Sequence, residues 1–236
     1  MDFIKENIGE VRERIRTACE RSGRDVSEVT LIAVSKTKPV SMILKAAEAG
    51  MQDFGENKPQ ELRDKLKELK EEQFPGLRFH MIGNLQANKI KYVVGEAVLI
   101  HSIDSVELAE AVSKEAVKRN VSCDILLEIN IAGEESKHGF SITEVLPAAE
   151  KIALLPGLCL RGLMTVAPYT ERAEENRHYF RKMKQLLIDI NSKNIDNVFM
   201  DMLSMGMTSD YEVAVEEGAT MVRIGTGIFG ERKYLN

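Results

Sequence analysis

Lys36 is the residue whose setting first suggests covalent chemistry. It follows the apolar run "LIAV" (31–34) closely along the chain. A lysine that is partly desolvated and lies beside another cation has a lowered pKa, since both effects disfavour the ammonium. The neutral amine is the nucleophile that forms Schiff bases with carbonyl compounds. We therefore expect a functional Lys36, the alternative being a side chain that extends its ammonium into solvent.

The stretch "RIGTGIFG" (223–230) offers a place for a phosphate. It satisfies the G-x-G-x-x-G pattern of dinucleotide-binding proteins. That fingerprint opens a long helix and has an acidic residue about 20 positions further on, whereas six residues follow Gly230. The pattern instead predicts a phosphate-binding turn in which Gly225 and Thr226 present backbone N–H groups, with the Ser204 hydroxyl as a further donor.

Alternating segments must position these residues. Residues 2–22 show the spacing of an amphipathic helix, and the run after it, 29–37, is apolar on both faces, as in a buried parallel strand. Helical patterns and further apolar runs then alternate to the end of the chain. We expect strands over 29–37, 51–57, 78–83, 97–104, 123–130, 159–166, 198–206 and 220–227. We expect helices near 40–49, 57–72, 84–94, 105–119, 142–155, 172–193 and 209–217.

Eight such repeats in 236 residues predict an α/β fold, a single TIM (β/α)8 barrel with an extra N-terminal helix that forms one domain over 1–236. An open, doubly wound sheet is the alternative. The charged run 61–73 keeps Leu62, Leu66 and Leu69 on one face, which predicts a solvated surface helix.

Because alternate side chains of a strand point to the same face, the candidate residues are expected to meet at one rim of the barrel. Lys36 is expected on the same strand face as Ile32 and Val34, Ser204 on that of Met200 and Met202, and Arg223 on that of Met221 and Gly225. Barrel closure places the last strand beside the first, so Arg223 and Lys36 become neighbours. Sites in this fold lie at the carboxyl ends of the strands, and phosphates commonly bind after strands seven and eight. A Schiff-base lysine near a phosphate site suggests either pyridoxal phosphate or a phospho-sugar aldolase, and spacing alone leaves both open.

The composition and the spacing of the other residues argue against several classes of protein. The net charge of −5 disfavours nucleic acid, no apolar run is long enough for a membrane span, and the start lacks the pattern of a signal peptide. Cys19, Cys123 and Cys159 form no C-x-x-C pair, and the four histidines show no metal-binding spacing. We expect a cytoplasmic monomer with reduced thiols and no metal.

The motifs together resemble the YggS/PROSC family of pyridoxal phosphate homeostasis proteins, whose domain is similar to the barrel of alanine racemases. The resemblance covers essentially the whole chain, through "AVSKTKP", "FGEN", "FHMIGNLQANK", "HSIDS", "SKHGF", "RGLMT" and "LSMGMTSDYEVAVEEGATMVRIG". It implies that Lys36 binds pyridoxal phosphate covalently, that Ser204, Gly225 and Thr226 hold its phosphate, and that Arg223 faces the pyridine nitrogen.

The resemblance also places Asn57 and His80 near the cofactor, with a structural hydrogen-bonding role as the alternative for His80. Lys137 and His138 lie in a loop that either folds over the site or is exposed. The chain departs from many relatives at Lys58 and Pro59, where they carry Tyr or Arg and then Val. Any role of an aromatic ring there is therefore in doubt.

The resemblance implies a carrier or buffer of pyridoxal phosphate, without turnover, that supplies the cofactor to apo-enzymes. An arginine donates hydrogen bonds but gives up no proton, so Arg223 leaves the pyridine ring a weak electron sink. A racemase needs a second base, for which Tyr169 is the candidate in this chain. A racemase, a lysine-imine aldolase and an interaction scaffold are the competing classes.

Overall fold

Eight parallel strands close into a barrel in the computed structural model, which describes residues 3–71, 76–134 and 138–231. Their order around the barrel follows the chain, and β1 pairs with β8 from Thr30 opposite Met221 to Ala33 opposite Ile224. The predicted TIM barrel is therefore confirmed, and the open sheet is excluded. The strands are β1 (Thr30–Val34), β2 (Asp53–Glu56), β3 (Arg78–Met81), β4 (Leu99–Ile103), β5 (Cys123–Glu128), β6 (Leu158–Met164), β7 (Val198–Met207) and β8 (Met221–Ile224).

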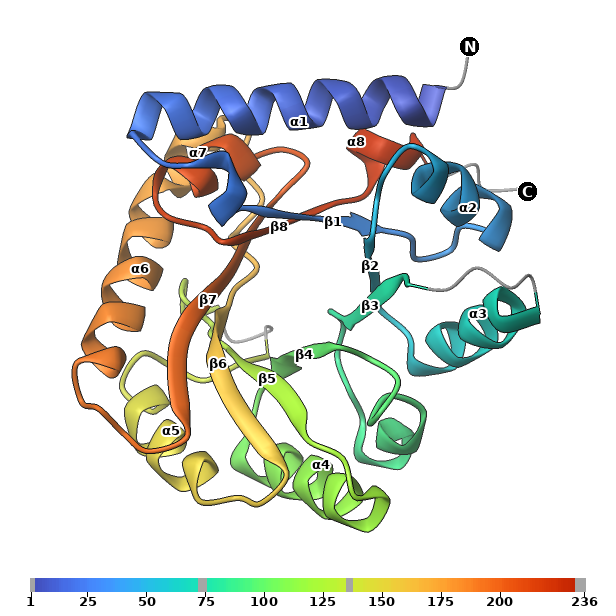
Figure 1. Ribbon diagram of the computed structural model, residues 1–236. Coiled ribbons are helices and arrows are strands. Elements are labelled where there is room, and N and C mark those ends of the chain that lie inside the picture. Colours follow the sequence, from blue (N-terminus) through green and yellow to red (C-terminus); the bar gives the residue numbers. More distant parts are fainter. Residues whose placement is uncertain (1–2, 72–75, 135–137, 232–236) are drawn as a thin grey trace.

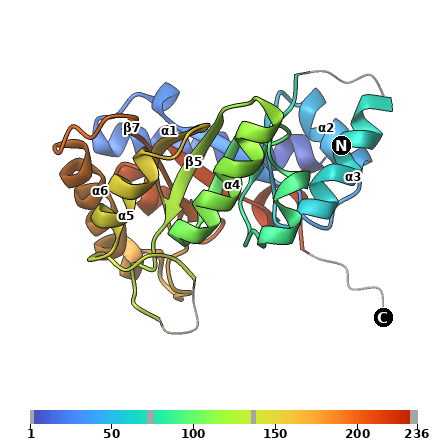
Figure 2. The same cartoon turned by 90° about the horizontal axis from the view of Figure 1, so that it is seen from below.

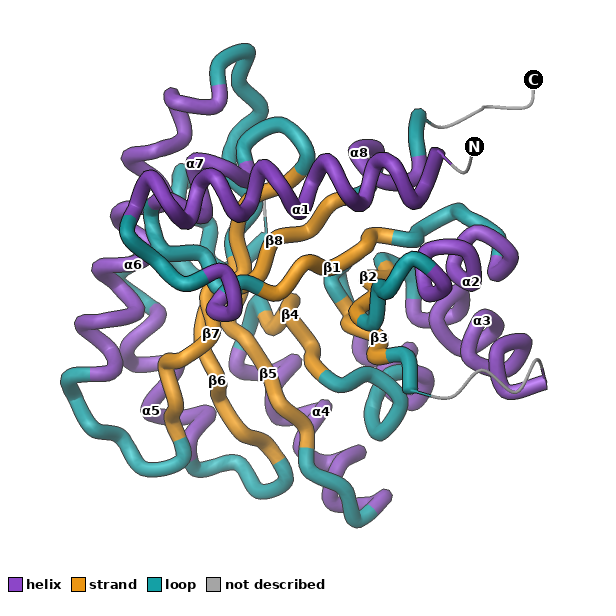
Figure 3. Tube along the Cα trace, turned by 45° about the horizontal axis from the view of Figure 1, so that its top comes forward, coloured by secondary structure: helices purple, strands orange, loops and turns teal. Residues whose placement is uncertain are grey.

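Helices surround the strands, as the tube view shows (Figure 3). The α-helices are α1 (Phe3–Ser22), α2 (Val40–Glu48), α3 (Pro59–Glu71), α4 (Val106–Arg119), α5 (Val145–Ala153), α6 (Arg177–Asn191), α7 (Tyr211–Glu216) and α8 (Thr226–Phe229). Short 3₁₀ segments occupy Val26–Glu28, Ala87–Tyr92 and Ala173–Asn176. The predicted extra N-terminal helix is α1, which lies along the outside of the barrel next to α7 and α8 (Figure 1).

Two apolar layers hold the barrel together. The large outer layer fills the space between strands and helices, including α1, whose Ile4, Ile8 and Ile15 are buried. The small inner layer is made by Ile32, Leu99, Leu126, Met164 and Met221, with Met202 against it. Ile32 and Met221 are thus inside the barrel, and Ala33 and Val222 outside it. The predicted inward faces of β1 and β8 are therefore confirmed, whereas Met200 of β7, expected on the inner face with Met202, packs in the outer layer.

One predicted helix has a different form. Residues 84–94 contain only the 3₁₀ turns Ala87–Tyr92, and the Val93 N–H bonds to the Ile90 carbonyl at 2.9 Å. Ile90, Val93 and Val94 are nevertheless buried, so the apolar spacing serves packing although the segment is not α-helical. In the described part of the chain, no helix is both long and apolar enough to span a membrane. The side view shows α4 beside β5 on the outer surface (Figure 2).

Candidate functional site

A cavity of about 540 Å³ opens at the carboxyl ends of the strands, where barrel sites are found. Its walls come from the segments that follow β1, β2, β3, β6, β7 and β8. The lining residues are Val34, Lys36, Asn57, Ile82, Val166, Tyr169, Met207, Thr208, Ser209, Arg223, Gly225 and Thr226. We call this cavity the upper pocket.

The upper pocket gathers Lys36, Asn57, Arg223, Gly225 and Thr226, which the sequence placed together. Ser204 is the exception. It is fully buried and does not line the pocket. In the pairing of β7 with β8, Ser204 lies opposite Met221, whereas Met207 lies opposite Arg223. Strand β7 runs to Met207 with a register shift, so Ser204 lies one layer below the rim.

Two hydroxyl residues that the sequence analysis missed, Thr208 and Ser209, occupy the rim position expected of Ser204. The Thr226 and Thr208 hydroxyls are 3.2 Å apart, and the Gly227 N–H donates to Thr208 Oγ1 at 3.4 Å. The ends of β7 and β8 therefore form one polar corner. Their place directly after the strand was the available signal, because rim residues follow a strand's last residue.

Arg223 is fixed beneath the upper pocket by two acceptors. Its Nη1 donates to Ser204 Oγ at 2.5 Å and its Nη2 to the Thr165 carbonyl at 2.8 Å. Burial lowers the pKa of Arg223 to about 10, and the Glu128 carboxylate is the larger of the opposing influences. The guanidinium is thus protonated at neutral pH, with its orientation set by the barrel wall.

A chain of buried polar side chains extends from Arg223 through the barrel. Ser204 Oγ is 2.9 Å from His101 Nδ1, and His101 Nε2 is 3.0 Å from His80 Nδ1. His80 Nε2 is 3.0 Å from Asp53 Oδ1. Arginine only donates and a carboxylate only accepts, so the contacts are all satisfied when each group donates in turn toward Asp53. His80 is therefore a structural hydrogen-bonding residue in this structure and does not line the upper pocket.

His101 should make the protein's stability pH-dependent. Burial lowers the pKa of His101 well below its usual value, with His80 and Arg223 adding to the effect. Below about pH 6.5 His101 binds a proton in the unfolded chain but not in the folded chain. The free energy of unfolding therefore falls as the pH falls. We expect unfolding free energy to drop by up to about 1.4 kcal/mol more per pH unit in the wild type than in His101→Asn. Urea titrations between pH 6.5 and 5 measure this slope, and equal slopes would contradict it.

Asn57 is held against the pocket by a close backbone contact. A Cβ on Gly83 would lie 2.5 Å from the Asn57 carbonyl oxygen, so only glycine fits there. The buried Oδ1 of Asn57 has no hydrogen-bond partner among the described residues. A buried acceptor without a donor is costly, and this one belongs to a residue that lines the upper pocket.

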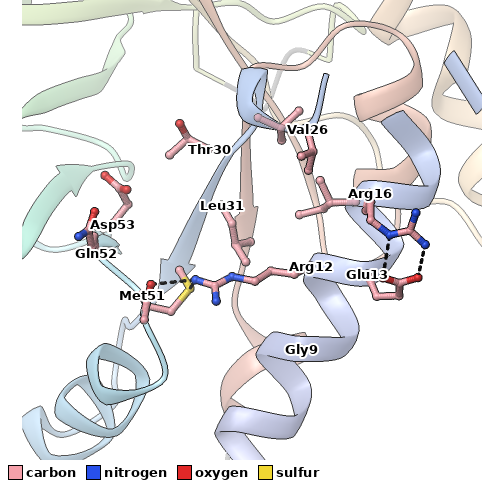
Figure 4. Close-up of a pocket in the computed structure, with 13 residues that line it drawn as sticks. Gly9, Arg12, Glu13, Arg16, Val26, Thr30, Leu31, Met51, Gln52 and Asp53 are labelled. Atoms are coloured by element: carbon pink, nitrogen blue, oxygen red, sulfur yellow. Dashed lines mark hydrogen bonds and ion pairs between the residues drawn. The ribbon is translucent and has the colours of Figure 1, made fainter. Parts of the chain in front are cut away.

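A second cavity of about 520 Å³ lies at the opposite, amino end of β1 and β2, beneath α1. Figure 4 shows Arg12 extending from α1 toward Met51. Its Nη2 donates to the Gly50 carbonyl at 2.8 Å, so this guanidinium links α1 to the end of α2. That contact is structural, in keeping with the stabilising role of the amino face of such barrels.

The comparisons with known proteins agree with this geometry. The family model of the alanine racemase N-terminal domain matches residues 7–233. A curated "Pyridoxal phosphate homeostasis protein" of Aquifex aeolicus is 44% identical over 229 residues, which are 97% of this chain and 98% of that protein. The chain belongs to the pyridoxal phosphate homeostasis protein family. An Escherichia coli K12 member with the same name is 40% identical over 235 residues, 99% of each chain.

Solved structures show the same relationship. PipY of Synechococcus elongatus, solved with pyridoxal phosphate (PLP) bound, has a TM-score of 0.82 and 33% identity, covering 96% of this chain and all of that one. An alanine racemase of Clostridium difficile has a TM-score of 0.71 at 13% identity and covers 100% of this chain but 58% of the enzyme. The enzyme match shows a shared barrel fold.

Two further segments singled out in the sequence can now be placed. At the Lys58–Pro59 departure, Pro59 is the first residue of α3, a position that suits proline because its missing N–H would have no partner there. His138 is exposed, with Nδ1 3.6 Å from Asp104, and Lys137 lies outside the described residues. No cluster of potential metal ligands occurs among the residues that the structure describes.

Proposed function

We propose that this protein binds pyridoxal 5'-phosphate in the upper pocket as a Schiff base on Lys36 and acts in cellular homeostasis of that cofactor. The observation that carries the proposal is that Lys36 lines the same pocket as Arg223 and the Thr208–Thr226 corner. When bound, the cofactor supplies an aldehyde that condenses reversibly with an amine and a ring that withdraws electrons. The structure of PipY with PLP bound supports the assignment, because PipY is similar to this chain in sequence and fold.

The pocket residues fit the parts of the cofactor. Gly225, Thr226, Thr208 and Ser209 would hold the phosphate, since hydroxyl and backbone N–H donors suit an anion. Arg223 would donate to the pyridine nitrogen, which is an acceptor. The unpartnered Asn57 Oδ1 would accept from a hydroxyl group of the ligand.

We further propose that the protein carries the cofactor without turning over a substrate. A racemase needs a base on each face of the substrate carbon, and Tyr169 at the pocket is 88% exposed. An exposed phenol with no packing to orient it is a poor positioned base. Deuterium exchange at the α-carbon of amino acids, tested with the loaded protein, would instead support a racemase-like enzyme.

Under this proposal the carrier works as a cytoplasmic monomer and supplies apo-enzymes that use the cofactor. Its three free cysteines suit a reducing compartment. The test mixes loaded protein with an apo-enzyme directly and, in parallel, across a dialysis membrane. Direct delivery predicts faster reactivation in the mixed sample than with free cofactor at the same concentration. Equal rates in all arms would refute delivery by contact.

A further inference from the structure

Lys65 of α3 is buried close to Lys36, where it pairs with the buried Glu56 and the half-buried Glu61. It is 7% exposed, although it belongs to a helix whose neighbouring charges face solvent. Its ammonium donates to Glu56 Oε1 at 2.7 Å, to Glu61 Oε1 at 2.7 Å and to the Ser35 carbonyl at 2.8 Å. All three N–H donors of the lysine are therefore used. We call Lys65, Glu56 and Glu61 the Lys65 cluster.

The Lys65 cluster binds the residues on both sides of Lys36. Ser35 accepts at its carbonyl from Lys65, and its hydroxyl donates to Glu56 Oε1 at 2.6 Å. On the other side, the Thr37 N–H donates to Glu61 Oε1 at 2.5 Å. The backbone before and after Lys36 is thus held by one connected group of charges.

Thr37 is strained at the point where the cluster holds it. Its φ of 63° lies in the left-handed region, which is unfavourable for a β-branched residue. Such a conformation costs about 1–3 kcal/mol and persists only where surrounding contacts enforce it. The bond to Glu61 is such a contact, so Glu61 helps to hold the turn that follows Lys36.

The cluster is poorly suited to a purely stabilising role. Buried ion pairs often contribute less than apolar packing would, because desolvation offsets the attraction. Glu56 is fully buried and its Oε2 has no hydrogen-bond partner among the described residues. Burial accordingly raises the pKa of Glu56, against the influence of Lys65. What the cluster does provide is three hydrogen bonds to the neighbours of Lys36, two of them to Ser35 and one to Thr37.

We propose that Lys65, Glu56 and Glu61 are positioning residues that orient the Lys36 amine for Schiff-base formation. The inference rests on the proposed function. In the step concerned, a C=N bond forms between Lys36 Nζ and the aldehyde carbon, and the C=O bond breaks. The aldehyde oxygen leaves as water with the two protons of the amine. The hydrogen bonds described above end on residues 35 and 37, so the cluster acts through the segment that carries Lys36.

The test compares two ligands that share ring and phosphate. Pyridoxal 5'-phosphate has the aldehyde, whereas pyridoxine 5'-phosphate has an alcohol in its place and forms no Schiff base. For Lys65→Met and Glu61→Gln we expect affinity for the aldehyde to fall by about tenfold or more, with a matching loss of the borohydride-reducible fraction. Affinity for the alcohol should stay within about twofold. Lys67→Met and Glu68→Gln, exposed on the same helix, are the matched controls.

The outcomes separate the two proposals. Wild-type protein that forms no borohydride-reducible bond would refute the proposed function itself. If the wild type forms the bond and the cluster variants bind both ligands normally, or lose both equally, only the positioning role is wrong. Should Lys65→Met fail to fold, Glu61→Gln decides, because it keeps the side-chain volume and leaves the Lys65 and Glu56 pair intact.

Discussion

Lys36→Ala is expected to abolish the covalent, borohydride-reducible complex with pyridoxal 5'-phosphate. The substitution removes the amine of a residue that lines the upper pocket, while the hydroxyl corner and Arg223 remain to bind the phosphate and ring. We expect affinity to weaken by about 100-fold, or roughly 2.7 kcal/mol. Equilibrium dialysis measures the affinity, and the visible absorption band of the loaded protein reports the Schiff base.

Lys45→Ala is the control for this variant. Lys45 is an exposed lysine on α2, and its loss should leave both the band and the affinity unchanged. A Lys36→Ala protein that retains a reducible band of full intensity would show that another amine holds the cofactor.

Arg223→Met is expected to impair both stability and binding. Ser204 Oγ and the Thr165 carbonyl each lose a buried donor, and leaving buried acceptors unpaired costs about 1–3 kcal/mol per group. Burial of the Arg223 charge is unfavourable and lowers its pKa to about 10, so removing this charge offsets part of the cost. We expect a net loss of about 2 kcal/mol in unfolding free energy, measured by urea titration without cofactor. Affinity for pyridoxal 5'-phosphate should fall by about tenfold, because the pyridine nitrogen loses its donor.

Arg161→Met provides the comparison. Arg161 pairs with Asp124 and Asp201 on the partly exposed outer surface, where ion pairs are typically worth about 0–1 kcal/mol. It should change stability little and leave binding intact. Equal effects of the two substitutions on both measurements would contradict the role given to Arg223.

Periodicity allowed the barrel and most of the pocket to be predicted. Alternation within strands placed Ile32 and Met221 inside the barrel, and closure placed β8 beside β1. These two facts bring Arg223 and Lys36 to the same pocket. They follow from strand geometry, which depends on local sequence.

Depth along a strand was harder to predict. The alternation of side chains correctly placed Ser204 on the inner face of the barrel. In the structure Ser204 lies below the rim, because β7 continues to Met207 and shifts register against β8. The rim residues Thr208 and Ser209 directly follow the strand and were missed because Ser204 was assigned to the rim in their place. A register shift depends on contacts with the neighbouring strand, which the sequence of β7 alone does not contain.

The Lys65 cluster shows a different limit. The charged run 61–73 was predicted to be a solvated surface helix, and Lys67 and Glu68 are indeed exposed. Lys65 is buried because its acceptors come from residues 9 and 30 positions away, Glu56 and Ser35. Helical periodicity assigns a face to a lysine but does not reveal a distant carbonyl that will receive its ammonium.

The most direct test of the account is to locate the attachment site of the cofactor. Protein saturated with pyridoxal 5'-phosphate is reduced with borohydride and digested, and the modified peptide is sequenced by mass spectrometry. We predict a single stoichiometric adduct on Lys36. Stoichiometric modification of a different lysine, or no adduct despite saturating cofactor, would contradict the assignment of the upper pocket.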